Sequence, residues 1–223
     1  MKKIVAINKS KGPTSHDIIN QLRRITGTKK IGHAGTLDPL ASGVLVVAIS
    51  REATKQIDQI VNTEKEYLAT IKLGEQSSTD DEEGEKEIFE VTTKPDNKQV
   101  EQALSQFIGQ IEQIPPQFSA IKVQGRAAYK SARLGQTIKL KPRPVEIKNI
   151  EILEYVWPIL KIKVTTGKGV YIRSLARDLG RSLGCGGYLA DLVRTRVGEF
   201  TLENSHTVEQ FGKAWKTSYN DQA

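Results

Sequence analysis

The chain has 223 residues, of which 38% are hydrophobic and 26% charged. This length and composition are typical of a globular protein and exclude a disordered chain. No apolar run approaches a membrane span, and the single cysteine, Cys185, excludes an internal disulfide framework, so we expect a cytoplasmic protein. The net charge of +7 favours a polyanionic partner, nucleic acid first.

The first part of the chain predicts a strand, a helix, a second strand and a second helix. Residues 4–7 are apolar and predict the opening strand. The first helix is capped by Thr14 or Ser15 and ends at Gly27, because apolar residues recur between them at helical spacing. The pattern then predicts a buried strand and a second helix, at residues 44–49 and 54–62.

Residues 30–45 combine three glycines, a histidine and an aspartate around the start of that buried strand. Glycine lets the backbone turn tightly or approach a ligand, and Pro39 stiffens the backbone after Asp38. One carboxylate is thus presented on a stiff loop that core structure anchors, as enzymes present catalytic groups. The alternative is an ordinary turn, since Asp-Pro beside glycine is a common turn former.

The rest of the chain predicts strands and helices without strict alternation. Residues 65–74 alternate as a strand does, and residues 145–155 and 159–166 predict two strands that pair. Other expected elements are strands at 87–91 and 194–200, helices at 95–108, 127–134 and 175–183, a helical turn at 188–192, an extended proline-rich connection at 114–120 and weak helical periodicity within 201–223. We therefore predict an α+β fold with a mixed, largely antiparallel central sheet flanked by helices.

Charge is segregated along the chain. Eight basic residues lie between Lys122 and Lys148 against one acid, Glu146, whereas nine acids lie between Asp80 and Glu101. Such segregation gives the folded protein a preferred side for a phosphate backbone. The alternative for the basic block is a solvated face with no partner.

Four other features stand out, each with an ordinary structural alternative. Tyr67 is either a functional residue or an ordinary core aromatic of its strand. The acidic run 79–84 is either part of a site or an ordinary solvated turn. Arg173, where a strand passes into a helix, is either a surface arginine or a buried one that needs a carboxylate partner, and Asp38 would serve. Two arginines that alternate on a strand indicate a solvent-facing row that could also touch phosphate, namely Arg194 and Arg196.

The segment Gly32-His33-Ala34-Gly35-Thr36-Leu37-Asp38-Pro39 resembles the signature of the TruB family, the tRNA pseudouridine-55 synthases. Companion motifs occur in the family's order: Gly12-Pro13-Thr14-Ser15-His16-Asp17, Lys65-Glu66-Tyr67, Thr79-Asp80-Asp81, Pro115-Pro116-Gln117-Phe118, Gly169-Val170-Tyr171-Ile172-Arg173 and Gly184-Cys185-Gly186-Gly187. The resemblance covers roughly residues 4–200 and implies a pseudouridine-synthase fold.

The resemblance implies three catalytic residues. Asp38 would be the nucleophile that isomerises a uridine to pseudouridine, attacking either C6 of the uracil or C1′ of the ribose. Tyr67 would stack on the flipped base and help to remove the C5 proton. Arg173 would pair with Asp38 and keep it ionised and aimed. No metal or organic cofactor is implied.

The resemblance also implies how RNA is held. A base cannot turn within its stack, so the uridine must be flipped out. His33 would support the flipped nucleotide or its RNA loop, Tyr171 and Leu192 would line the uridine pocket, and Asp81 would contact or order the site. A basic insertion at about residues 117–145 would grip the T arm of tRNA. The expected RNA contacts are Lys9, Lys30, Lys122, Arg126, Lys130, Arg133, Lys141, Arg143, Arg194 and Arg196.

The expected organisation is a catalytic domain at 1–200, followed by a short tail at 201–223 in place of the C-terminal PUA domain of many relatives. Asn8-Lys9-Ser10 stands where Asp-Lys-Pro is usual, and Phe118 where tyrosine is common. We expect a monomer that needs no protein partner. Two alternatives stay open: a tRNA-binding or folding chaperone without turnover, and the same reaction on another RNA.

Overall fold

The structure, a computed structural model, describes residues 3–119, 121–123, 126–128, 132, 134 and 138–220; at 122, 123, 126, 127 and 218–220 it describes the backbone alone. These residues form two compact units. Unit 1 combines the chain up to Tyr67 with the chain from Leu192 onward, and unit 2 runs from Leu68 to Asp191. Two strands, β4 (Lys65–Leu73) and β12 (Gly187–Val197), therefore contribute residues to both units.

Unit 1 is built around β3 (Ala41–Ile49), which is buried along almost its whole length. β1 (Lys3–Lys9) and β2 (Ile31–His33) pair with it in antiparallel fashion. β1 occupies one edge of β3, whereas β2 and the parallel strand β12 share the other edge. β12 pairs in turn with β13 (Phe200–Thr201). A strand with neighbours on both edges and both faces covered is expected to be a continuous apolar run, as residues 44–49 are.

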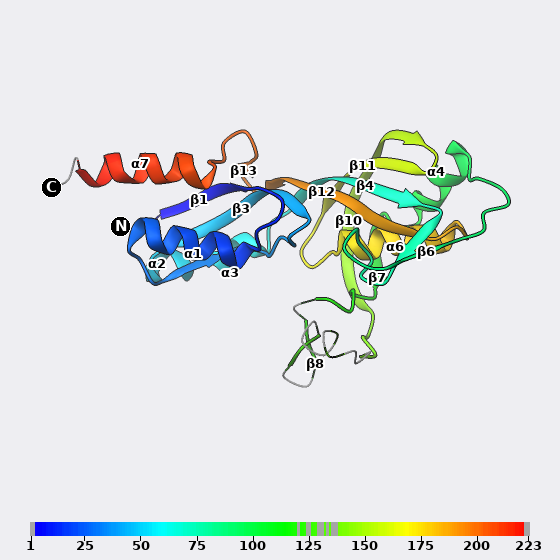
Figure 1. Ribbon diagram of the computed structural model, residues 1–223, viewed down its shortest axis with the longest axis horizontal. Helices are drawn as coiled ribbons and strands as arrows, with labels where there is room; N and C mark the ends of the chain where they lie inside the picture. The colour runs from blue at the N-terminus through cyan, green and yellow to red at the C-terminus, as the bar shows by residue number, and fades with distance from the viewer. Residues whose placement is uncertain are drawn as a thin grey trace. The chain divides into compact units, whose positions relative to one another are not determined.

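The helices of unit 1 follow local sequence signals. α1 (Ser15–Thr26) begins with a capping box between Thr14 and Asp17 and ends at Gly27 in the left-handed conformation, as predicted. α7 (Val208–Asn220) runs alongside β1 (Figure 1), and its Gly212 faces Ile25 of α1. The predicted helix 54–62 is instead two short helices, α2 (Arg51–Thr54) and α3 (Ile57–Val61). The Gln56 amide donates to the Ala53 carbonyl, three residues earlier, as in a 3₁₀ turn. This bond interrupts the α-helical hydrogen-bond pattern between the two helices.

Unit 2 contains a second run of strands, in the order β4, β11 (Ile159–Thr166), β10 (Arg143–Val156) and β7 (Gly109–Gln113). β10 is antiparallel to both of its neighbours. Two small hairpins pair β5 (Glu75–Ser77) with β6 (Lys86–Ile88) and β8 (Lys122–Val123) with β9 (Arg126–Ala127). Two helices, α4 (Asn97–Ser105) and α6 (Ile172–Ser182), contact each other.

The fold class is confirmed as α+β with a mostly antiparallel sheet, but two further local predictions were wrong. Residues 188–192 are not a helical turn, because strand pairing draws them into β12. The helix expected at 95–108 ends as α4 at Ser105, and residues 109–113 form the unpredicted strand β7. None of the described helices is both long and apolar enough to cross a membrane.

Gly43 gives a test of how closely β3 and β12 must approach. Its φ is +101°, and an added Cβ would lie 2.2 Å from the carbonyl oxygen of Arg194. Gly43→Ala should therefore lower the free energy of unfolding by about 3 kcal/mol or more, from backbone strain and the clash together. Gly12→Ala is the matched control, because Gly12 has the same φ with nothing within 4 Å. Equal losses in urea unfolding of the two variants would contradict this account.

Candidate active site

Asp38 lies in the loop between β2 and β3, and hydrogen bonds from α1 and its preceding loop hold that loop. The Ser15 hydroxyl donates to the Leu37 carbonyl at 2.9 Å and accepts from the Leu37 amide at 2.8 Å. The Gly12 amide donates to the Pro39 carbonyl at 2.9 Å. The backbone on both sides of Asp38 is thus fixed, while the residue itself is half-buried. This is the stiff, anchored loop that the sequence predicts.

The buried Arg194 side chain holds the same loop through hydrogen bonds. Its side chain is 2% exposed, and Nε donates to the Val44 carbonyl at 2.8 Å. The two Nη atoms face the carbonyls of Gly35, at 3.1 Å, and Thr36, at 3.5 Å. The guanidinium therefore joins β3 to the backbone just before Asp38. This corrects the prediction of a solvent-facing Arg194 that touches phosphate, because burial removes it from the surface.

Lys9 is the second buried cation beside Asp38. Its side chain is fully buried, and Nζ donates to the carbonyls of Ser10 at 2.9 Å and Pro13 at 2.8 Å. Burial lowers the pKa of Lys9 to about 8, while the Asp38 carboxylate opposes the shift and Arg194 adds to it. The expected surface contact of Lys9 with RNA is corrected for the same reason as that of Arg194.

His33 is half-buried in β2, in register with Val47 of β3. Burial lowers the pKa of its imidazole, and the positive charge of Arg194 lowers it further. The ring is therefore neutral at pH 7, which suits stacking or neutral hydrogen bonding better than pairing with a phosphate.

Tyr67 and Leu192 also belong to unit 1. Tyr67 is 7% exposed on β4, and Leu192 is 8% exposed on β12. Leu192 pairs in register with Ala41, whose amide donates to the Asp38 carbonyl at 3.1 Å. The structure thus places Leu192 next to the turn that carries Asp38.

Arg173 and Asp81 form a buried ion pair in unit 2. Their side chains are 6% and 4% exposed, and Nη1 of Arg173 lies 3.2 Å from Oδ2 of Asp81. Arg173 also donates to the Phe118 carbonyl at 2.9 Å. Arg173 is therefore buried with a carboxylate partner, as a buried arginine requires, and the acidic run is not simply a solvated turn. The pairing of Arg173 with Asp38 joins residues of the two units and stays a prediction.

Tyr171 lies at the N-cap of α6, where its backbone is held on both sides by one side chain. Oε1 of the Gln113 side chain accepts from the Tyr171 backbone amide at 2.8 Å, and Nε2 donates to the Tyr171 carbonyl at 3.1 Å. This fixes the start of α6 to the end of β7. The Tyr171 ring itself is half-buried.

The other expected RNA contacts are spread over both units. Lys30, Lys141 and Arg143 are exposed, whereas Arg196 is part-buried and paired with Glu64. Lys122 and Arg126 are described by their backbone alone, in β8 and β9, and Lys130 and Arg133 lie outside the described residues.

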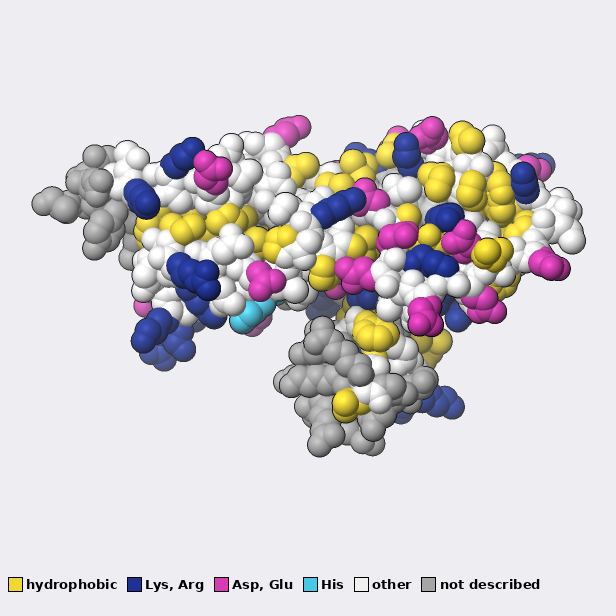
Figure 2. Space-filling model, viewed as in Figure 1, with side chains coloured by type: hydrophobic (Ala, Val, Ile, Leu, Met, Phe, Trp, Pro, Cys, Tyr) yellow, Lys and Arg dark blue, Asp and Glu magenta, His cyan; other side chains and the backbone are white. Residues whose placement is uncertain are grey.

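The structure adds a basic patch around Lys30 that the sequence did not single out. Figure 2 shows Lys and Arg side chains gathered over α1 and α2 in unit 1. The exposed basic residues of α1, α2 and the adjoining turns are Arg24, Lys29, Lys30, Arg51 and Lys55. They come from separate stretches of the chain, which meet because α2 and β2 are in contact and the Ser50 amide donates to the Lys30 carbonyl.

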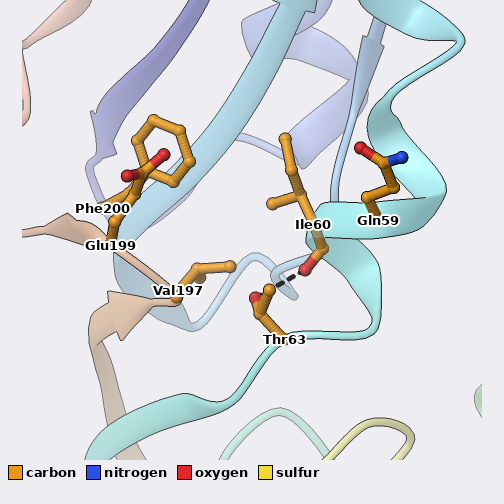
Figure 3. A pocket seen from close by; sticks show the side chains of 7 residues that line it. Gln59, Ile60, Thr63, Val197, Glu199 and Phe200 are labelled. Atoms are coloured by element: carbon orange, nitrogen blue, oxygen red, sulfur yellow. Dashed lines mark hydrogen bonds between the residues drawn. The ribbon is translucent and has the colours of Figure 1, made fainter.

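A cavity of about 310 Å³ in unit 1 lies between α3 and the turn from β12 to β13. Figure 3 shows Ile60 and Gln59 of α3 facing Phe200 and Glu199, with Val197 between them. None of the predicted site residues lines it. Among the described residues, no group of three His, Cys, Asp or Glu could hold a metal ion.

Comparison with known protein families gives matches along most of the chain. Residues 23–172 match the model described as "TruB family pseudouridylate synthase (N terminal domain)". Residues 173–223 match "tRNA pseudouridylate synthase B C-terminal domain". Proteins named tRNA pseudouridine synthase B are similar throughout. That of Arthrobacter sp. (strain FB24) is 44% identical over 94% of this chain and 70% of its own length. That of Parabacteroides distasonis is 45% identical over 93% of this chain and 90% of its own.

Two solved structures match nearly the whole of this chain. The structure described as "Crystal Structure of a Cbf5-Nop10-Gar1 Complex" matches with a TM-score of 0.74 and 28% identity, over 99% of this chain and 56% of that chain. An "H/ACA RNP bound to a substrate RNA containing 2'-deoxyuridine" matches with a TM-score of 0.72 and 27% identity, over 99% and 55%. This chain thus spans little more than half of the length of those two.

The charge coupling between Asp38 and Lys9 can be measured. The Asp38 carboxylate raises the pKa of Lys9, so Asp38→Asn should move that pKa below about 8. NMR titration of ¹³C-labelled lysine side chains would report it, with Asp58→Asn, an exposed acid of α3, as the control. In the unfolded chain the pKa of Lys9 is about 10.5, so between about pH 8 and 10.5 only the unfolded chain keeps the Lys9 proton. The free energy of unfolding should therefore rise with pH over this range. An unchanged Lys9 pKa in Asp38→Asn would show that the two groups are not coupled.

Proposed function

The chain belongs to the TruB family of pseudouridylate synthases, and we propose that it isomerises the uridine at position 55, in the T loop of tRNA, to pseudouridine. The family makes the chain an RNA pseudouridine synthase, which is an isomerase. The named position and the residue roles below are the proposal. The observation that carries it is the half-buried Asp38 on a loop braced by Ser15 and Arg194.

In the proposed reaction Asp38 is the nucleophile. Its carboxylate forms a bond with C6 of the uracil or with C1′ of the ribose, and the bond from N1 to C1′ breaks. The base turns, C5 bonds to C1′, the C5 proton leaves, N1 gains a proton and the carboxylate is released. Reactant and product have the same atoms and electrons, so the reaction requires no redox cofactor, and we propose that it uses neither cofactor nor metal.

The surroundings of Asp38 suit an ionised and fixed carboxylate. Two buried cations, Lys9 and Arg194, lie in the same unit, and positive charge favours the ionised form of a nearby acid. The brace on Gly35 and Thr36 limits motion of the loop, which keeps the nucleophile where the flipped base would arrive. We propose that Arg173 also orients Asp38, and that Asp81 in turn orients Arg173 through their buried pair.

The remaining residues are proposed to hold RNA. Tyr67 would stack on the extruded uracil and assist loss of the C5 proton, and the neutral His33 would support the flipped nucleotide. Tyr171 and Leu192 would line the uridine pocket. The T arm would be gripped through its phosphates by exposed basic residues, including the patch around Lys30, and the enzyme would act as a monomer.

Asp38→Asn tests the proposal. The variant keeps the size of the side chain but loses the nucleophile, so pseudouridine formation in a T-arm stem-loop should fall by at least about 1,000-fold. RNA affinity should stay within about 3-fold of wild type, because the phosphate contacts are unchanged. Product can be counted in purified RNA after single-turnover reactions.

Asp58→Asn is the control, since it removes the same charge from an exposed site in unit 1. Near wild-type turnover by Asp38→Asn would overturn the assignment of the nucleophile. Wild-type protein that binds the stem-loop without making pseudouridine would support a binding or folding role instead. Mapping modified uridines in total cellular RNA, with and without the protein, would distinguish position 55 from another target.

A further inference from the structure

Helix α6 presents two arginines on one face, four residues apart, that make parallel sets of contacts. Arg173 binds Asp81 and the Phe118 carbonyl. One turn later, Nη1 of Arg177 lies 2.8 Å from Oδ2 of Asp80, and its Nη2 donates to the Ile114 carbonyl at 2.8 Å. Each arginine thus ties one acid of the loop 79–81 to one carbonyl of the segment 114–118.

The segment 114–118 depends on such side-chain donors. Pro115 and Pro116 have no amide hydrogen, so this stretch cannot be fixed by an ordinary backbone ladder. The Ile114 carbonyl accepts from both Arg177 and the Ser174 hydroxyl, the latter at 2.8 Å. Side chains of α6 therefore hold this segment through its carbonyl oxygens.

The same segment begins the expected insertion and is joined to its later part. The Gln117 side chain donates to the Ile138 carbonyl at 2.8 Å and accepts from the Ile138 amide at 3.2 Å. The expected RNA-gripping insertion covers about residues 117–145, so residue 117 begins it and residue 138 lies in its last part. Whatever fixes residues 114–118 therefore fixes the start of the insertion and, through Gln117, the chain at residue 138.

Besides the Ile114 carbonyl, Arg177 binds the Asp80 carboxylate, whose backbone is itself held in place. The backbone of Asp80 has a φ of +61°, and its carbonyl accepts from the Leu189 amide of β12 at 3.1 Å. The side chains of Arg177 and Asp80 are 11% and 15% exposed, so little water competes for their contact. Asp178 completes the set, because its two carboxylate oxygens accept from Nε and Nη2 of Arg177 at 2.8 and 3.1 Å.

We propose that Arg177 is a positioning residue, which fixes the base of the insertion against the acidic loop and so sets the affinity for the RNA stem-loop. This rests on the proposed function. It assigns Arg177 to the grip on RNA, away from the bond-making step. Burial raises the pKa of Asp80, and Arg177 opposes that rise, so removing Arg177 would also make the Asp80 carboxylate harder to ionise.

The experiment compares Arg177→Ala with Arg181→Ala. Arg181 is on the same helix, is 65% exposed and reaches Asp178 only at 3.9 Å, so its removal costs the same charge without freeing Ile114. Arg177→Ala should weaken binding of a T-arm stem-loop by about 10-fold, with kcat at saturating RNA within about 3-fold of wild type. Arg181→Ala should change the dissociation constant by less than about 3-fold.

Hydrogen exchange in the absence of RNA measures whether Arg177 fixes the segment 114–118. Protection of the Ile138 amide, which donates to the Gln117 side chain, should fall about 10-fold in Arg177→Ala, while amides of β10 and β11 keep theirs. Arg177→Lys keeps the charge but cannot reach Asp80, Asp178 and Ile114 together, so it should restore only part of the affinity. Asp80→Asn removes the same tie from the other side and should shift affinity and exchange in the same direction.

Three results would overturn the proposal: unchanged exchange of the Ile138 amide, a loss of kcat with unchanged affinity, or full restoration by Arg177→Lys. If Arg177→Ala does not fold, Asp80→Asn gives the same test by itself. A wild-type protein that makes no pseudouridine would overturn the proposed function, whereas the exchange result would still decide whether Arg177 holds the segment.

Discussion

The loop that carries Asp38 depends on the buried guanidinium of Arg194. A cation in a protein interior is costly unless its donors are satisfied, and here backbone carbonyls satisfy them. The burial of the cation and the conformation of the loop therefore support each other. Gly43 makes the arrangement possible, because the absence of its side chain lets β3 approach the Arg194 backbone. A larger residue would separate the strands and take the guanidinium away from its carbonyls.

The two units use buried cations in different ways. In unit 1, Lys9 donates to carbonyls of the loop after β1. Lys65 donates to the carbonyls of Val61, the last residue of α3, and of Thr63, at 2.7 and 2.6 Å. Burial lowers the pKa of both lysines to about 8. In unit 2, arginines of α6 bind carboxylates of the acidic loop as well as carbonyls. Backbone carbonyls thus accept from the buried lysines of unit 1, whereas carboxylates pair with the arginines of α6 in unit 2.

These arrangements fit the demands of a reaction in which a base leaves its ribose and returns in a new orientation. In the proposed mechanism Asp38 has to be held still while the base moves, which a braced loop achieves better than a mobile one. The same proposal needs the RNA to be gripped through its phosphates while one nucleotide is extruded. The proline-rich segment would be a rigid base for such a grip, because α6 holds its carbonyls and Gln117 joins it to Ile138.

The sequence by itself determined the elements that local patterns encode: α1 through its capping residues, β4 through alternation, the pair β10 and β11, and the loop of Asp38 through its glycines and proline. Ordered motifs identified the family. Only the tertiary structure decided that Lys9 and Arg194 are buried, that residues 188–192 form a strand and that Asp81 pairs with Arg173. The physical reason is sequence distance. Arg194 binds a carbonyl 150 residues away, and Arg173 an acid 92 residues away, which no local spacing reports.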